Sequence, residues 1–139
     1  MQKGFSLIEV MIVVVILGIV IAIGLMNYMV YIKKTAVSIG LAEITSLKIE
    51  YEMAVNERYS DLAISSNLQL KNSHYCNFSA TLPEMVTKVA EKALICTFKN
   101  TNLFGANTQI YLTRDVVGQY SCHAQNIEQK YLPENCTQN

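Results

Sequence analysis

The sequence predicts an α+β fold, in which a long N-terminal helix packs on an antiparallel sheet. A helical spacing of apolar residues continues without a proline from Phe5 to Asn56, and three β-rich segments follow after residue 90. The gaps between these segments are short, whereas parallel neighbours would need longer crossovers. The 139 residues, of which 51% are hydrophobic, fit one globular domain and exclude a disordered chain.

The first half of the predicted helix is apolar. Val10 to Ile32 contains no charged side chain, and Asn27 is its only amide. Such a helix is roughly 35 Å long at about 1.5 Å per residue, and the hydrocarbon core of a bilayer is about 30 Å thick. Residues 5–32 are therefore expected to span a membrane or to pack in an equally apolar environment.

The second half of the predicted helix is amphipathic. From Lys33 onward charged and polar residues are frequent, so residues 33–139 are expected to form a water-soluble head that includes this half of the helix. One stripe of apolar side chains recurs every three or four residues, which predicts a face that lies on the sheet: Val37, Leu41, Ile44, Leu47, Tyr51 and Ala54.

The rest of the head predicts a loop followed by strands. Asn56–Tyr75 is polar and reads as a loop, and Pro83–Val89 is compatible with a short helical turn or an edge strand. Ala93–Phe98, Gln109–Arg114 and Gly118–His123 are the predicted strands, because β-branched and aromatic residues lie between turns that contain Asn, Gly or Asp.

Three interpretations of the N-terminal segment differ in where the chain would be cut. A secretory signal peptide would use the weak site Ala22-Ile23-Gly24, and Glu9 counts against it. A plain membrane anchor leaves Glu9 unexplained, because an unpaired carboxylate deep in a membrane costs a few kcal/mol. A cleaved leader in front of a retained helix is the third interpretation.

The residues Lys3-Gly4-Phe5-Ser6-Leu7-Ile8-Glu9-Val10, followed by the apolar run, resemble the class III leader and N-terminus of type IV prepilins. The resemblance implies a pilin of the type IVa family, with residues 1–4 as the leader. A prepilin peptidase would cut between Gly4 and Phe5 on the cytoplasmic side and methylate the Phe5 amine. That amine and the Glu9 carboxylate would then pair between subunits, since either charge buried alone is strongly unfavourable.

The resemblance also implies partners and a location. The subunit would wait in the bacterial inner membrane and polymerise with other pilin subunits through its N-terminal helix, driven by an assembly platform and ATPase. The product would be an extracellular pilus that serves adhesion, twitching motility or DNA uptake. One departure is Met26, which stands where such pilins carry a helix-breaking proline, so any melting of the helix would depend on Gly18, Gly24 and Asn27.

The four cysteines allow three pairings on sequence grounds. The stretch from Tyr120 to Cys136 resembles the disulfide-closed C-terminal loop of type IVa pilins, which implies Cys122–Cys136 and leaves Cys76 with Cys96. The alternative is a metal site, because His74 precedes Cys76 by two residues and His123 follows Cys122. No Cys-x-x-Cys spacing occurs, so neither a metal nor another cofactor is expected.

The sequence predicts no enzyme, because it holds no nucleophile elbow, phosphate loop or zincin motif. A minor pilin, a DNA-uptake pilin and a type II secretion pseudopilin share the same helix and remain alternatives. Net charge is zero, so nucleic-acid binding would need a local stripe of cations. The candidates are interspersed with acids: Lys71, Lys88, Lys92, Lys99, Arg114 and Lys130.

Overall fold

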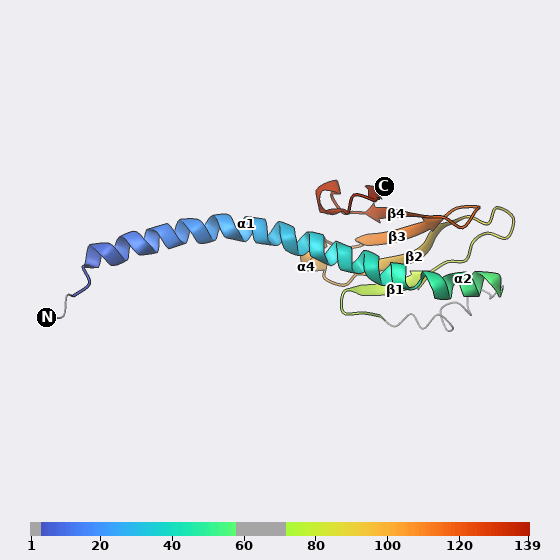
Figure 1. Ribbon diagram of the computed structural model, residues 1–139, viewed down its shortest axis with the longest axis horizontal. Coiled ribbons are helices and arrows are strands. Elements are labelled where there is room, and N and C mark those ends of the chain that lie inside the picture. The colour runs from blue at the N-terminus through green and yellow to red at the C-terminus, as the bar shows by residue number, and fades with distance from the viewer. Residues whose placement is uncertain (1–3, 58–71) are drawn as a thin grey trace. The chain divides into compact units, whose positions relative to one another are not determined.

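A computed structural model of the protein describes residues 4–57 and 72–139. The chain forms two compact units, Met1–Ile32 and Lys33–Asn139, and we call the second unit the head. The fold is α+β: a long N-terminal helix and a five-stranded sheet, as the sequence predicts (Figure 1). The predicted loop over Asn56–Tyr75 lies mostly outside the described residues.

The helical region has one interruption that the sequence does not predict. The helical residues run from Leu7 to Asn56, as the sequence predicts, with Leu47 as a single turn residue between helix α1, Leu7–Ser46, and helix α2, Lys48–Asn56. Next to this turn, the Ser46 hydroxyl donates to the carbonyl oxygen of Glu43 at 2.7 Å, a local side-chain bond that competes with the helical pattern. The helix resumes at once, because the Tyr51 N–H donates to the Leu47 carbonyl at 2.9 Å.

The head contains one sheet with strand order β1-β2-β3-β4-β5. The first four strands form an antiparallel meander, and β5 pairs with β4 in parallel. A parallel partner is possible here because residues 126–135 return along the sheet through the short 3₁₀ helix η1. The bounds are β1 Cys76–Ala80, β2 Ala90–Phe98, β3 Gln109–Arg114, β4 Tyr120–Gln125, η1 Gln129–Tyr131 and β5 Cys136–Gln138.

The predicted strands are confirmed with shifted ends, and two strands are new. β3 has the predicted bounds, β2 begins before Ala93, and β4 begins at Tyr120 and extends past His123. The sequence does not predict β1 and β5, since both are short and largely polar. Pro83–Val89 is a turn in which the Lys88 N–H donates to the Glu84 carbonyl, and a further short helix, α4 Thr101–Phe104, follows β2.

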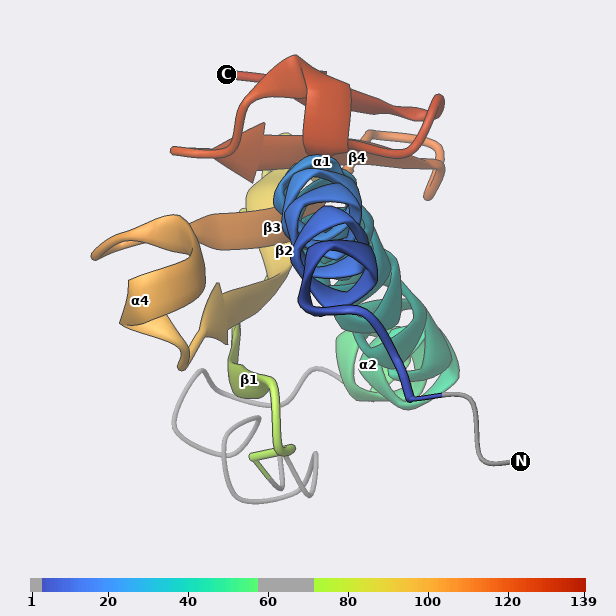
Figure 2. The same ribbon diagram turned by 90° about the vertical axis from the view of Figure 1, so that its left-hand side faces the viewer.

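The core of the head lies between the helices and the sheet. Figure 2 shows the strands on one side of the helical residues that belong to the head. The predicted stripe faces them: Val37, Ile44 and Tyr51 are fully buried, and Leu41 and Leu47 pack against the same cluster as partly buried residues. Buried strand residues complete this core, among them Leu94, Cys96, Ile110 and Leu112.

Gly40 sets the distance between helix α1 and the sheet. A Cβ atom at this position would lie 2.9 Å from Cζ of Phe98 and 3.2 Å from Sγ of Cys96. The Phe98 ring cannot easily retreat, because it is buried and packs on Phe104 with ring centroids 4.8 Å apart. The absent side chain therefore allows the helix to approach β2 closely.

Candidate assembly site

The segment before helix α1 contains the predicted processing residues. Gly4, Phe5 and Ser6 have no regular secondary structure and are exposed, and the Phe5 side chain is 82% exposed. No heavy atom lies within 4 Å of the position that a Cβ on Gly4 would take. The peptide bond between Gly4 and Phe5 is thus accessible in this unit.

Glu9 caps the start of the helix. The backbone N–H of Ser6 donates to Oε2 of Glu9 at 3.0 Å, and the N–H groups of Glu9 and Val10 donate to the Ser6 carbonyl. A serine followed three residues later by a glutamate forms half of a capping box, and a carboxylate is favoured at the positive end of a helix. The resemblance implies only a charge partner for Glu9, so this capping contact is an additional role.

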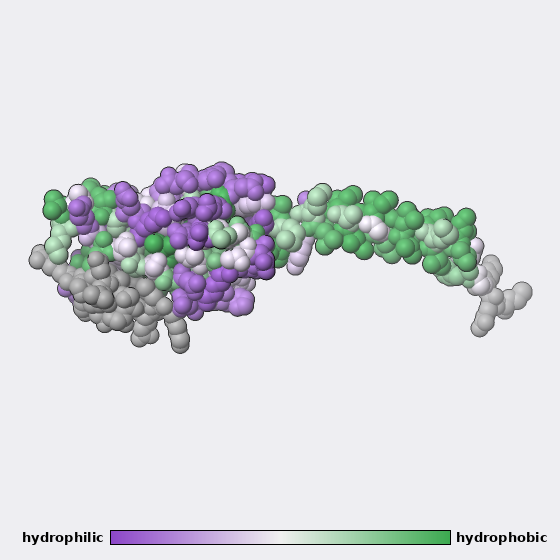
Figure 3. Space-filling view, turned by 180° about the vertical axis from the view of Figure 1, so that it is seen from behind, coloured by the Kyte–Doolittle hydropathy of each residue, from purple (hydrophilic) through white to green (hydrophobic). Residues whose placement is uncertain are grey.

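The surface of the N-terminal unit is apolar. Its large hydrophobic side chains are exposed from Phe5 to Tyr31, and green residues cover the face of this unit seen in Figure 3. Helix α1 continues through Gly18, Gly24 and Met26, and the Asn27 side chain bonds to the Ile23 carbonyl at 3.5 Å. By length and composition, this helix is long enough and apolar enough to cross a membrane.

The head contains two disulfide bonds. Cys76–Cys96 joins β1 to β2, and Cys122–Cys136 joins cross-strand partners on β4 and β5. The side-chain amide of Gln129 donates to the Cys136 carbonyl at 3.0 Å and accepts from the Gln138 N–H at 3.1 Å. Gln129 thus braces the second disulfide loop, a role that no local sequence signal indicates.

The residues considered for metal binding do not come together. Within residues 4–57 and 72–139 there is no group of three His, Cys, Asp or Glu side chains that could hold an ion. His123 lies between the hydroxyls of Ser121 and Thr137, and the His74 ring contacts Tyr75. All four cysteine sulfurs are in disulfides, so none is available as a thiolate ligand.

A polar cluster fastens helix α2 to the sheet. Arg114 donates from Nε and Nη2 to the two carboxylate oxygens of Glu52 at 2.8 and 3.1 Å, and the Tyr120 hydroxyl donates to Glu52 at 2.6 Å. The hydrogen bond from Arg114 lowers the pKa of Glu52, against an opposing effect of burial. Burial and the bond to Glu52 raise the pKa of Tyr120, so its hydroxyl stays a donor.

Four of the six candidate DNA-binding cations make contacts within the head, whereas Lys88 is exposed. Lys92 donates to Gln125 at 3.0 Å, Lys99 donates to the Ser73 carbonyl at 2.6 Å, and Lys130 pairs with Glu128. Arg114, at the end of β3, pairs with Glu52, and Lys71 lies outside the described residues. The described cations therefore give no support for a DNA-binding stripe.

Comparisons with known proteins agree with this arrangement. Residues 34–137 match the family described as pilin (bacterial filament), and residues 1–25 match a prokaryotic N-terminal methylation motif. A probable minor fimbrial protein of Dichelobacter nodosus is 28% identical over 97% of this chain and 94% of its own length. The type IV major fimbrial protein FimA of the same organism is 30% identical over 98% of this chain and 95% of its own length.

A shorter match is closer in sequence. A fimbrial protein of Pseudomonas aeruginosa is 46% identical over 40% of this chain and 36% of its own length. The family match covers most of the head and the methylation motif covers the segment before it. The chain belongs to the pilin family of bacterial filament proteins, and is a structural, non-enzymatic type IV pilin.

Proposed function

We propose that the protein is made as a prepilin, cut between Gly4 and Phe5, and polymerised through its N-terminal helix into an extracellular pilus. Before assembly the subunit resides in the bacterial inner membrane, with its head on the periplasmic side. The prepilin peptidase makes the cut and methylates Phe5, and an assembly platform with its ATPase extracts the subunit. The partners in the filament are further pilin subunits.

The exposed apolar surface of the N-terminal unit is the observation that carries this proposal. The large apolar side chains from Phe5 to Tyr31 are exposed, so water is an unfavourable environment for this part of the chain. A bilayer covers this surface in the precursor. A bundle of identical helices covers it in the filament, so the subunit moves between two apolar environments.

The charge of Glu9 explains why neighbouring helices in that bundle would adopt one axial register. Its carboxylate lies at the start of the helix and accepts a hydrogen bond from the Ser6 N–H. Ser6 directly follows Phe5, and cleavage would give Phe5 a free amine. An unpaired charge inside a helix bundle costs several kcal/mol, and a nearby opposite charge removes most of this cost. Pairing of Glu9 with a Phe5 amine therefore favours one axial register between neighbours.

The intact mass of the protein tests the processing step. We expect protein from sheared filaments to lack Met1–Gly4, to carry one added methyl group and to have four fewer hydrogens for its two disulfides. Protein that keeps its leader and occurs only in membranes would contradict both cleavage and export.

Two substitutions at Glu9 separate its capping contact from its charge. Glu9→Gln keeps an oxygen that can accept from the Ser6 N–H but removes the charge, and Glu9→Ala removes both. If charge pairing sets the register, both variants are processed but yield few filaments. Normal filaments from Glu9→Gln together with none from Glu9→Ala would assign Glu9 a capping role only, and Glu50→Gln is the control at an exposed carboxylate.

A minor subunit is the second candidate function. The relatives that match along nearly the full chain include probable minor fimbrial proteins as well as a major one. The ratio of this chain to total pilin in sheared filaments distinguishes the two. A major subunit accounts for most of the filament mass, whereas a minor subunit is found at a small fraction of it.

A further inference from the structure

Two tight turns at one end of the head carry exposed apolar side chains. Met85 and Val86 lie in the β1–β2 turn and are 94% and 89% exposed, and Val116 and Val117 lie in the β3–β4 turn and are 59% and 74% exposed. The turns are neighbours, because Nη1 of Arg114 donates to the Lys88 carbonyl at 3.1 Å and to the Asp115 carbonyl at 3.4 Å. We call these four side chains the apolar tip, and green residues appear at this end of the head in Figure 3.

Polar contacts hold both turns in fixed conformations. The Asp115 carboxylate accepts from the N–H groups of Val117 at 3.0 Å and Gln119 at 2.7 Å. In the other turn the Thr87 hydroxyl donates to the Glu84 carboxylate at 2.9 Å. Braced turns present apolar side chains with little ordering cost on binding, and adjacent exposed apolar residues of this kind indicate an interaction surface.

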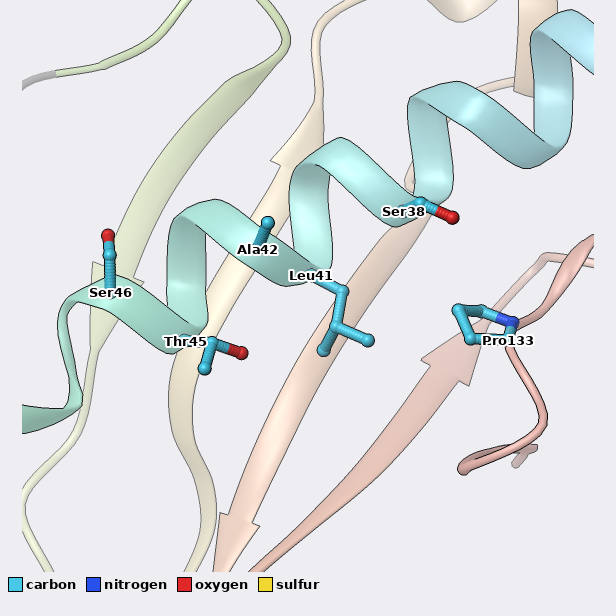
Figure 4. A pocket seen from close by; sticks show the side chains of 6 residues that line it. All are labelled: Ser38, Leu41, Ala42, Thr45, Ser46 and Pro133. Atoms are coloured by element: carbon cyan, nitrogen blue, oxygen red, sulfur yellow. The ribbon is translucent and has the colours of Figure 1, made fainter.

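The head also has a shallow hollow whose lining includes no charged residue. It has a volume of about 610 Å³ and lies between helix α1 and the loop before β5. In Figure 4 the side chains of Leu41 and Thr45 extend from the helix toward the side where Pro133 stands. The lining residues are Ser38, Leu41, Ala42, Thr45, Ser46 and Pro133.

The apolar tip and the hollow of one chain are too far apart to meet. Met85 and Val55 line the same depression, and Val55 lies nine residues beyond Ser46, the last helix residue that lines the hollow, which corresponds to about 14 Å along a helix. Contact between the two surfaces is therefore possible only between copies. A contact between two different patches of identical chains is heterologous, and such contacts propagate into an open filament unless the rotation closes them into a ring.

We propose that the apolar tip of one head docks in the hollow of a second copy of this chain, so that two different surfaces of neighbouring heads meet in the filament. Apolar side chains enter the hollow without removing water from a charge, because none of its six lining residues is charged. The net charge of zero means that two copies do not repel each other overall. The proposal rests on the proposed function, because it requires that the chain polymerises.

Cysteine cross-linking in filaments of the full-length chain tests the contact. We expect Val117→Cys combined with Ala42→Cys to give a ladder of disulfide-linked multimers after mild oxidation, because each chain offers both halves of the contact. Either single substitution alone should give no ladder. The matched control combines Val117→Cys with Ser79→Cys, at an exposed position on β1 away from the hollow, and should also give none.

A second set of variants tests whether the contact contributes to assembly. Val116→Asp with Val117→Asp should lower the yield of sheared filaments at least tenfold, while the thermal unfolding of the head stays unchanged because both side chains are exposed. Gln119→Glu adds a charge to the same turn without removing an apolar side chain, and should leave the yield near that of the wild type.

The outcomes separate this proposal from the proposed function. Absence of wild-type filaments overturns both. Wild-type filaments without a ladder from the Val117→Cys and Ala42→Cys pair overturn the docking contact alone, whether or not the aspartate variants assemble. Cross-linked products whose masses are not multiples of this chain overturn a second copy as the occupant.

Discussion

The contact between Glu52 and Arg114 joins residues 62 positions apart and holds helix α2 against β3. The Arg114 side chain is 12% exposed and the Glu52 side chain 32%, so the pair is better shielded than a surface ion pair. The same guanidinium bonds to the carbonyls of Lys88 and Asp115. One side chain therefore links the helix, the β1–β2 turn and the β3–β4 turn.

We predict that this pair makes the head sensitive to acid. The hydrogen bond from Arg114 lowers the folded-state pKa of Glu52 below its ordinary value of 4.5, so the carboxylate binds a proton less readily in the folded state than in the unfolded one. Its contribution to the free energy of unfolding is complete above about pH 6 and is lost as pH falls through the lowered pKa.

Glu52→Gln should therefore lower the free energy of unfolding at neutral pH by about 1 kcal/mol and reduce its loss between about pH 6 and pH 3. Denaturant unfolding of the full-length chain in detergent at several pH values measures both effects. Glu50→Gln is the control on an exposed position of the same helix. Equal acid sensitivity in the Glu52→Gln variant and the wild type would rule out this carboxylate as a cause.

The sequence predicts the N-terminal residues of the candidate site but not the contact between Glu52 and Arg114. Gly4, Phe5 and Glu9 are close in sequence, so their spacing is enough to identify the pattern. Arg114 and Glu52 are far apart, and their contact depends on the register of β3, so the sequence shows only scattered charges. The Ser6-x-x-Glu9 spacing also carries a capping signal, but the apolar run and the cleavage motif dominate the interpretation of this segment.

Helix α1 and the sheet meet at Gly40, where the close approach leaves no room for a methyl group. We predict that Gly40→Ala destabilises the head by about 1 to 2 kcal/mol. Overpacking of a dense core costs about 1 to 3 kcal/mol, and the higher helix propensity of alanine returns up to about 1 kcal/mol of this. The unfolding temperature of the full-length chain in detergent measures the net effect.

Gly24→Ala is the matched control for Gly40→Ala. Gly24 is also in α1, but no heavy atom lies within 4 Å of its Cβ position and it belongs to the N-terminal unit. This change should leave the unfolding of the head unaltered. A head that is stabilised by Gly40→Ala would show that Phe98 can move and that the helix does not need to approach so closely.

Strand β5 depends on its covalent link more than on its length. It has only three residues, of which Thr137 and Gln138 are exposed, and Cys122–Cys136 and the amide of Gln129 hold it beside β4. Replacing Cys122 and Cys136 by alanine should lower the free energy of unfolding by about 3 kcal/mol in the chain-entropy account of a loop of this size.

Hydrogen exchange locates the loss in this variant. The backbone amides of Gln138 and Asn139 should exchange much faster, while those of Ile110 and Leu112 in the central strand β3 keep their protection relative to global unfolding. Uniform loss of protection across the sheet would mean that the disulfide supports the entire head. Gln129→Ala, with the disulfide intact, is the comparison that isolates the amide brace.

Strands that face the core are predictable from the sequence, and strands at the edges are not. β2 and β3 contain runs such as Ala93-Leu94-Ile95 and Ile110-Tyr111-Leu112, whose burial favours β-branched and aromatic residues. β1 and β5 contain mainly small or polar residues, so their composition carries little information, and a disulfide joins each of them to its neighbouring strand in the sheet.

The two units are stabilised by different environments, which allows them to be disrupted separately. The N-terminal unit exposes its apolar side chains and needs lipid or neighbouring helices, whereas the head buries its own core. A charge placed near the middle of a membrane helix costs about 2.5 to 3.5 kcal/mol. A charge placed in the head is costly only where its side chain is buried.

We therefore predict opposite effects for two isoleucine-to-lysine changes on the same helix. Ile16→Lys should reduce membrane retention and filament yield but leave the unfolding temperature of the head unchanged, because Ile16 is exposed in the N-terminal unit. Ile44→Lys should lower that unfolding temperature strongly while the precursor stays in the membrane, because Ile44 is fully buried in the head.

Alkaline extraction of membranes and thermal unfolding in detergent give the two readouts. If Ile16→Lys also lowers the unfolding temperature of the head, the units are coupled and the N-terminal helix supports the head directly. If Ile44→Lys instead releases the precursor from the membrane, the apolar run from Val10 to Ile32 is not sufficient as an anchor. Separate responses mean that selection can alter the head, and so the pilus surface, without altering the helix that assembles it.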